Sequence, residues 1–192
     1  MGLMGAGKST VARALADRLD RPVVDSDLEL ERASGLNAEE WRDQRGTRAL
    51  HAREASILLE ALSMRRPAVI CAAASTIERE PCRAALRRSA AIIVWLKARP
   101  DTLAARFARE GHRPRFGSDP RAVLLRQASR RDPLFQAMAA VTIDVDRLDP
   151  PAVVAQIEHA LSARLRAANR PGSREHRVAD GGSQGPPRHT GR

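Results

Sequence analysis

Aromatic residues are scarce in this chain of 192 residues, and tyrosine is absent altogether. Aromatics make up 3% of the sequence, although 43% of the residues are hydrophobic. We therefore expect a core built from alanine, leucine, valine and isoleucine. Single-strand nucleic-acid binders add stacking aromatics to a basic groove. The chain carries a net charge of +10 without those aromatics, so we expect no nucleic-acid partner and assign the charge to sites for anionic small molecules.

Cysteines and long apolar runs are also few. The two cysteines, Cys71 and Cys82, match no metal-ligand spacing, and nothing in the sequence suggests secretion. No apolar run reaches the roughly 18 residues that a membrane-spanning helix needs. We expect a cytoplasmic protein without a signal peptide or a membrane partner, and a monomer.

One octapeptide, Gly-Leu-Met-Gly-Ala-Gly-Lys-Ser at residues 2–9, matches the phosphate-binding loop pattern G-x-x-x-x-G-K-[ST] at every fixed position. Glycines let backbone N–H groups close around phosphate oxygens because no Cβ intervenes. Lys8 is one of only two lysines in the chain, and its ammonium would reach the outer phosphates while the Ser9 hydroxyl holds Mg²⁺. The alternative is a glycine-rich turn before an ordinary helix. The expected nucleotide-binding residues of the loop are Gly5, Ala6, Gly7, Lys8, Ser9 and Thr10.

Only Met1 precedes this loop in the sequence. A phosphate-binding loop ordinarily follows a buried strand in the middle of a parallel sheet. Without that strand, the core would have a gap and both neighbouring strands would have unpaired edges. Two explanations compete: Met1 is an internal residue of a longer chain, which we favour, or the protein is a truncated form of low stability. Sequencing the N-terminus of the native protein would decide between them.

Apolar runs alternate with helical patterns along the rest of the chain. The patterns predict strands at 21–25, 67–71, 91–96 and 141–145. Alternating strands and helices indicate an α/β protein of three layers, with a parallel sheet covered by helices on both faces. We expect one domain over residues 1–168, followed by a disordered basic tail at 169–192. Helices are expected at about 10–16, 28–33, 38–64 with a break at Gly46, 81–88, 100–110, 120–131 and 150–168.

Two carboxylates, Asp25 and Asp27, follow the first predicted strand. Ligands of open α/β sheets bind at the carboxyl ends of the strands. One carboxylate could therefore orient Mg²⁺, and the other could accept the proton of an acceptor hydroxyl. The structural alternative is that Asp27 is the N-cap of the helix that follows it.

Arginines are the candidates for binding the transferring phosphate and the substrate. Arg113 lies in a polar segment over residues 111–120, which we expect to be an exposed loop that closes over the γ-phosphate. The alternative is a solvated surface arginine. Arg130 and Arg131 precede Pro133, where we expect a helix to end, and the helix dipole alone favours arginine at such a position.

These motifs resemble the shikimate kinase family, from the phosphate loop to about residue 165. Besides the loop, Asp25-Ser26-Asp27 matches the Asp-x-Asp segment of the family, Arg113-Pro114 matches its closing lid, and Arg131-Asp132-Pro133-Leu134-Phe135 is similar to its Arg-x-Pro-Leu-Tyr segment. The resemblance implies Mg²⁺ and hydroxyl contacts for the Asp-x-Asp segment, which we assign to Asp25 and Asp27 respectively. It also implies that Arg131 binds the substrate carboxylate and that Arg106 and Pro150 enclose adenine. It also implies a five-stranded P-loop kinase sheet, with the first strand missing here.

Two segments depart from the family pattern. Ala72-Ala73-Ala74 stands in place of three glycines, and each alanine adds about 1 kcal/mol of strain wherever φ is positive. His51 stands where the family has an arginine paired with the substrate carboxylate, and histidine offers no bidentate fork. Glu54 is retained, and Arg48, one turn before His51, could compensate. We expect His51 and Ala73 to contact the substrate.

The nucleotide-binding half of the motifs is therefore intact, whereas the acceptor-binding half is altered. The leading hypothesis is an ATP- and Mg²⁺-dependent kinase that phosphorylates a small acidic hydroxylated metabolite. The resemblance implies shikimate, a precursor in aromatic amino acid biosynthesis. A kinase for another hydroxy acid or polyol stays open, as does a nucleotide or metabolite sensor without turnover. A basic nucleic-acid-associated ATPase is a weaker third reading.

Overall fold

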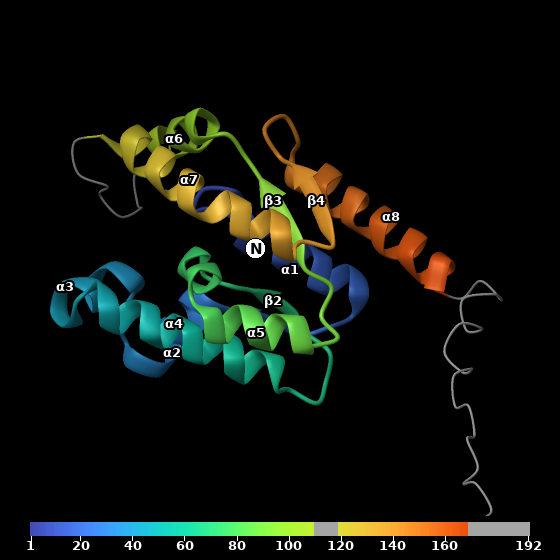
Figure 1. Ribbon diagram of the computed structural model, residues 1–192, viewed down its shortest axis with the longest axis horizontal. Helices are drawn as coiled ribbons and strands as arrows, with labels where there is room; N and C mark the ends of the chain where they lie inside the picture. Colours follow the sequence, from blue (N-terminus) through green and yellow to red (C-terminus); the bar gives the residue numbers. More distant parts are fainter. Residues whose placement is uncertain (110–118, 169–192) are drawn as a thin grey trace, which may run out of the picture.

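Two separate pairs of parallel strands lie at the centre of the protein. The computed structural model describes residues 1–109 and 119–168. In it, β1 (Val23–Asp25) pairs with β2 (Val69–Cys71), and β3 (Val94–Lys97) pairs with β4 (Val141–Asp144). Both pairs are parallel, and Figure 1 shows helices packed around them. The predicted α/β class is confirmed, although the described strands form two pairs rather than one continuous sheet.

Helices connect the strands, as the alternating pattern predicts. Local sequence signals set several of their ends: Asn37 and Glu40 form a capping box at the start of α3, and Gly35 ends α2 with a φ of 69°. The strand predicted from residue 91 begins only at Val94. The helices are α1 (Lys8–Leu19), α2 (Ser26–Ser34), α3 (Ala38–Arg45), α4 (Thr47–Leu62), α5 (Glu80–Arg88), α6 (Pro100–Arg109), α7 (Pro120–Met138) and α8 (Pro150–Ala168), and η1 (Ala74–Glu78) is a 3-10 helix.

Helix α7 does not end before Pro133, contrary to the sequence prediction. It continues through this proline to Met138, although an interior proline removes one backbone hydrogen bond and costs about 3 kcal/mol. Burial of the last turns offsets that cost: Phe135 is 1% exposed and its ring stacks on Trp95 of β3 with centroids 5.9 Å apart. Arg131 therefore lies inside the helix and not at its end.

A groove of about 700 Å³ lies between the two pairs of strands. Met1 is one of its lining residues: its amino group donates to the Val94 carbonyl at 2.7 Å, and its own carbonyl accepts from the Leu96 N–H at 2.9 Å. Met1 thus pairs with β3 as a strand residue would, and Figure 1 shows the amino terminus between the two halves of the molecule. A gap beside the phosphate loop is therefore present, as the sequence predicts. Apolar lining residues include Val11, Leu15, Leu58, Val69, Ile70, Leu86 and Ile93.

Candidate active site

The phosphate-binding loop runs from the edge of β3 into the first turn of α1. Gly7 is the N-cap of α1 with a φ of 81°, a left-handed conformation that glycine adopts without strain. At Gly2 a Cβ atom would lie 2.5 Å from the Leu96 carbonyl oxygen, so only glycine fits against β3. The loop N–H groups and the dipole of α1 therefore meet at one place, which is a favourable site for an anion.

Three of the predicted residues meet around Cys71 at the carboxyl end of β2. The Ser9 hydroxyl lies 3.7 Å from the Cys71 thiol, and the β1–β2 register places Asp25 opposite Cys71. Burial raises the pKa of Cys71, while the charge of Lys8 lowers that pKa and the charge of Asp25 raises it. The Lys8 ammonium donates to the Leu3 carbonyl at 3.1 Å, so it lies back along the loop.

Asp25, and not Asp27, is the N-cap of α2. An Asp25 carboxylate oxygen accepts the backbone N–H of Asp27 at 3.1 Å, and the residue is only 3% exposed. The alternative reading of Asp27 as the cap is therefore wrong, and the exposed Asp27 lies in the first turn of the helix.

These oxygens fit Mg²⁺, which typically takes one or two protein carboxylates together with substrate phosphates and water. The buried Asp25 lies opposite Cys71 in the β1–β2 register, and the Ser9 hydroxyl lies 3.7 Å from the thiol of the same cysteine. Within residues 1–109 and 119–168, no group of three or more histidine, cysteine or acidic side chains could hold a metal ion. Phosphate oxygens and water would therefore have to complete the coordination of Mg²⁺.

The adenine side of the predicted site is partly assembled. Arg106 of α6 donates to the Gly5 carbonyl at 3.2 Å and to the Val145 carbonyl at 2.6 Å. It therefore ties the phosphate loop to the segment that leads from β4 to Pro150, the first residue of α8. Ala6 is buried and Thr10 is exposed. Arg113 lies outside the described residues.

On the acceptor side, the three alanines adopt unstrained backbone conformations. Ala73 has a φ of −59°. Asp20 is the one non-glycine residue of the described chain with a positive φ. The condition under which these alanines would cost strain is therefore not met, and their effect is limited to the space that each Cβ fills. Both Ala72 and Ala73 are buried.

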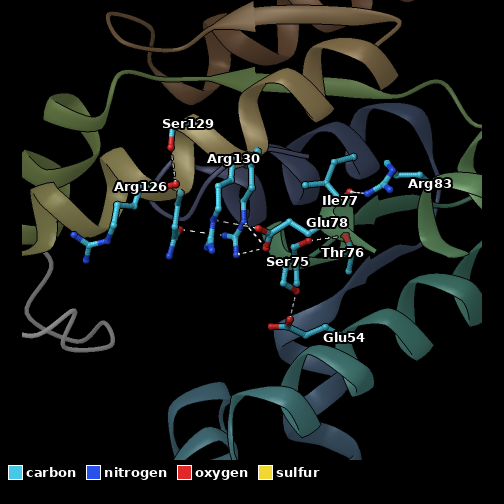
Figure 2. Close-up of polar contacts among 12 residues, drawn as sticks. Glu54, Ser75, Thr76, Ile77, Glu78, Arg83, Arg126, Ser129 and Arg130 are labelled. Atoms are coloured by element: carbon cyan, nitrogen blue, oxygen red, sulfur yellow. Dashed lines mark hydrogen bonds and ion pairs between the residues drawn. The ribbon is translucent and has the colours of Figure 1, made fainter. Parts of the chain in front are cut away.

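Glu54 of α4 lies buried among the predicted site residues. It is 7% exposed and accepts a short hydrogen bond from the Ser75 hydroxyl of η1, which Figure 2 shows. Burial raises the pKa of Glu54 from 4.5 to about 7. The Ser75 hydrogen bond lowers this pKa, the charge of Asp27 raises it, and the charges of Arg131 and Lys8 lower it. Asp27, Arg131 and Lys8 come from three different helices and all lie near this one carboxyl group.

Arg131 is buried, and its guanidinium has partners within the protein. It is 6% exposed; its Nε and Nη2 donate to Glu78 Oε2 at 3.0 and 2.9 Å, and its Nη1 donates to Gln127 Oε1 at 3.1 Å. The other Glu78 oxygen, Oε1, lies 3.4 Å from Arg130 Nε. The helix-end explanation for Arg131 is therefore wrong, because its side chain points inward from the middle of α7.

His51 lies beside the same charges. Burial lowers its pKa below the ordinary value of 6.5, and the charge of Arg131 lowers it further. Arg79 and Arg130 act in the same direction, while Glu78 opposes them. The net effect favours the neutral imidazole over a cation that could pair with a substrate carboxylate. Arg48 is exposed on the same helix.

Sequence reasoning missed Ser75 and Glu78, which follow the three alanines in η1. Their partners, Glu54 and Arg131, are 21 and 53 residues away along the chain. One signal was available: η1 follows the carboxyl end of β2, where polar side chains of an open α/β sheet face the ligand. A serine and a glutamate at that place are candidates for the site, although their partners cannot be read from the pattern.

The loop, the two strand ends beside it and the arginines of α6 and α7 define a P-loop kinase. A family model described as shikimate kinase matches residues 4–162. The chain belongs to the shikimate kinase family.

Individual relatives agree with this assignment. The chain is 36% identical over 148 residues to a shikimate kinase of Thioalkalivibrio sulfidiphilus, covering 77% of either chain. It is also 36% identical over 167 residues to that of Symbiobacterium thermophilum, covering 85% of this chain and 95% of the relative.

Solved structures show the same fold. Shikimate kinase from Acinetobacter baumannii in complex with shikimate superposes with a TM-score of 0.79 at 30% identity, covering 85% of this chain and 90% of that one. A gluconokinase from Sinorhizobium meliloti, with a TM-score of 0.58 and 23% identity, covers 88% of this chain and 95% of that one and shares the fold. None of the helices within residues 1–109 and 119–168 combines the length and apolarity that crossing a membrane requires.

Proposed function

We propose that this protein transfers the γ-phosphoryl group of ATP to a hydroxyl group of shikimate, in the presence of Mg²⁺. The observation that carries the proposal is the convergence of Lys8, Asp27 and Arg131 on the surroundings of Glu54, at the carboxyl ends of β1 and β2. Charges of the kinds needed to bind a phosphate, orient an acceptor hydroxyl and bind an acceptor carboxylate thus act on one carboxyl group, which supports the proposal. Family membership and the relative solved with shikimate support the same acceptor.

The nucleotide side provides charge neutralisation. Lys8 and the loop N–H groups hold the β- and γ-phosphates, and the dipole of α1 adds to their attraction. Ser9 and Asp25 hold Mg²⁺, which neutralises charge on the phosphates when bound. Arg106 positions the loop from behind and, with Pro150, flanks the adenine. Phosphoryl transfer asks mainly for positioning and electrostatics, which is what these groups contribute.

The acceptor side orients the attacking hydroxyl. Asp27 accepts its proton through a hydrogen bond, and Arg113 completes the positive charge around the γ-phosphate. Arg131 binds the carboxylate of the acceptor, and the neutral His51 contributes a hydrogen bond without a charge. Ala73 contacts the ring of the acceptor.

The direct test is release of ADP with millimolar shikimate and saturating ATP. We expect shikimate-dependent turnover that falls by about 10² or more in Lys8→Ala, because a charge-stabilising donor is lost. Asp27→Asn should lose turnover while still binding ATP, since it removes only the group on the acceptor side. Folded protein that binds ATP but gives no shikimate-dependent ADP would refute the proposal.

A second candidate is a kinase for another small hydroxy acid or a polyol. The neutral His51 and the internally paired Arg131 favour it, because both weaken recognition of a carboxylate relative to the arginine of the family pattern. The same assay with gluconate, quinate and a neutral polyol distinguishes the candidates by their ratios of kcat/KM. A sensor without turnover would bind ATP and release no ADP with any of them.

We also infer a monomer, because one chain supplies the described residues on both sides of the site, and a cytoplasmic location, because the cysteine pattern does not suggest secretion. Light scattering at micromolar concentration tests the monomer, and cell fractionation tests the compartment. The domain boundary at residue 168 stays a prediction, since residues 169–192 lie outside the described part of the chain.

A further inference from the structure

Arg131 is bound by an internal carboxylate at the position where it would receive its substrate. Arginine offers a carboxylate its best geometry along an edge that carries two parallel N–H groups. The edge formed by Nε and Nη2 is occupied, because both donate to Glu78 Oε2 at 3.0 and 2.9 Å. Gln127 takes Nη1. An acceptor carboxylate must therefore displace Glu78 from this edge or use the end of the guanidinium, where Gln127 already accepts from Nη1.

Glu78 is placed to move aside. Its side chain is 28% exposed, whereas that of Arg131 is 7% exposed. Its second oxygen lies near the exposed Arg130 at 3.4 Å, so a carboxylate leaving Arg131 keeps a cation within reach. Figure 2 shows Glu78 directed from η1 toward the arginines of α7, with Ser75 of the same short helix directed toward Glu54.

The charges around this point make the competition selective. His51 is acted on by the charges of Arg131, Arg79 and Arg130 and by the carboxylate of Glu78. Glu78 is the carboxylate paired directly with Arg131, while the buried Glu54 also lies within reach of the Arg131 charge. A second carboxylate that enters is attracted by the arginines and repelled by Glu78, whereas a neutral acceptor feels neither effect.

We propose that Glu78 is a specificity-determining residue that competes with the acceptor carboxylate for Arg131 and thereby weakens binding of acidic acceptors. This inference rests on the proposed function, because it takes Arg131 as the carboxylate-binding group. It makes Glu78 a determinant of acceptor affinity in addition to the substitutions at His51 and Ala72–Ala74.

The experiment compares Glu78→Gln with the parent, using shikimate and its uncharged methyl ester. Glutamine keeps the shape of the side chain but removes its negative charge. We expect KM for shikimate to fall by about tenfold or more, the lower end of one charge-assisted contact, with kcat changed less than about twofold. KM for the ester should not change, since no carboxylate competes.

Glu158→Gln is the matched control. Glu158 is also 28% exposed and accepts a two-pronged pair from Arg18, but the pair joins α1 to α8. The substitution Glu158→Gln changes the net charge by the same amount as Glu78→Gln and should leave KM for shikimate unchanged. A second variant, Glu78→Ala, guards against an effect of the glutamine amide, and thermal unfolding shows that each variant is folded.

Equilibrium binding of shikimate by calorimetry separates this inference from the proposed function. Tighter binding in Glu78→Gln supports competition even if the parent releases no ADP, in which case only the proposed kinase activity fails. Equal or weaker binding in the variant would overturn the inference, because Glu78 would then position Arg131 instead of competing for it. A fall in KM for the ester as large as that for the acid would overturn it as well, and so would the absence of shikimate binding in both proteins.

Discussion

At the scale of single residues, the acceptor side is governed by burial as much as by charge. Glu54 and Arg131 are each less than 10% exposed, and each is satisfied by a polar neighbour from η1. A buried ionisable group without such a partner costs far more than a paired one. The 3-10 helix after β2 therefore provides a partner for each of these two groups: Ser75 donates to Glu54, and Glu78 accepts from Arg131.

Glu54 makes the stability of the protein depend on pH. Burial raises its pKa from 4.5 to about 7, so the folded state binds this proton more tightly than the unfolded state. The contribution is fully present below pH 4.5 and is lost as the pH rises through 7, to a total of about 3 kcal/mol. Glu54→Gln removes the titration. The free energy of unfolding of the variant, measured relative to the parent in urea, should rise between pH 5 and 8. A difference that does not change with pH would contradict this assignment.

His51 should behave as a neutral residue. Because burial and the nearby arginines lower its pKa, His51→Gln should change KM for shikimate by less than about twofold at pH 7.5. His51→Arg adds a cation able to form a bidentate pair and should lower KM by about tenfold. Steady-state kinetics at pH 7.5 measure both effects. A large rise in KM for His51→Gln would mean that the imidazole is charged when substrate is bound.

At the scale of elements, packing overrides a local sequence signal in α7, namely the proline in its interior. Pro133 should end the helix, yet the helix continues because Phe135 is buried against Trp95 of β3. Arg131 is presented to the acceptor side from a helix that is held at both ends, by Asp119 as N-cap and by Phe135 in the core. The position of the arginine is thus fixed by contacts on either side of it.

Replacing the interior proline should stabilise the protein. Pro133→Ala restores a backbone N–H inside α7 and should raise the free energy of unfolding by about 1–3 kcal/mol. Pro120→Ala is the control, because Pro120 stands at the first turn of the same helix, where proline is favoured. Chemical denaturation of the three proteins measures the effect. A loss of stability in Pro133→Ala would show that the proline ring packs better than the restored hydrogen bond.

At the scale of the whole molecule, the groove between the two strand pairs is the main departure from a complete sheet. Strands β2 and β3 both border it, and Met1 pairs with β3 alone. Burial lowers the pKa of the Met1 amino group from 8.0 to about 5, and the charge of Lys8 lowers it further. A charged amine is therefore disfavoured at a place where a strand would put a neutral amide.

Filling the groove should stabilise the molecule. Fusing five apolar, β-branched residues to the amino group of Met1 replaces the amine with an amide and supplies a strand between β2 and β3. Burial of two aliphatic side chains alone contributes at least about 3 kcal/mol to the free energy of unfolding. A glycine–serine extension of equal length is the control, and urea denaturation measures the difference. Equal stability of the two fusions would mean that the groove does not accept a strand.

Features set by short-range chemistry could be predicted. The phosphate loop was found because its glycines and Lys8 act within one octapeptide, and the helix at 150–168 matches α8 at both ends. Pro133 misled the prediction because its effect on the helix is local, whereas the burial of Phe135 that overrides it is not. Asp27 was considered as a cap, but Asp25 takes that role because β1 extends to it.

The sequence by itself determined the chemistry of the nucleotide side, because loop, lysine and serine are neighbours along the chain and need no distant partner. Only the tertiary structure decided the state of the acceptor side. The pair of Arg131 with Glu78 and the pair of Glu54 with Ser75 join segments 53 and 21 residues apart, and the lowered pKa of His51 follows from its burial and from the arginine charges that folding brings near it. Burial and pairing set the charge of these groups, and neither property exists until the elements have packed.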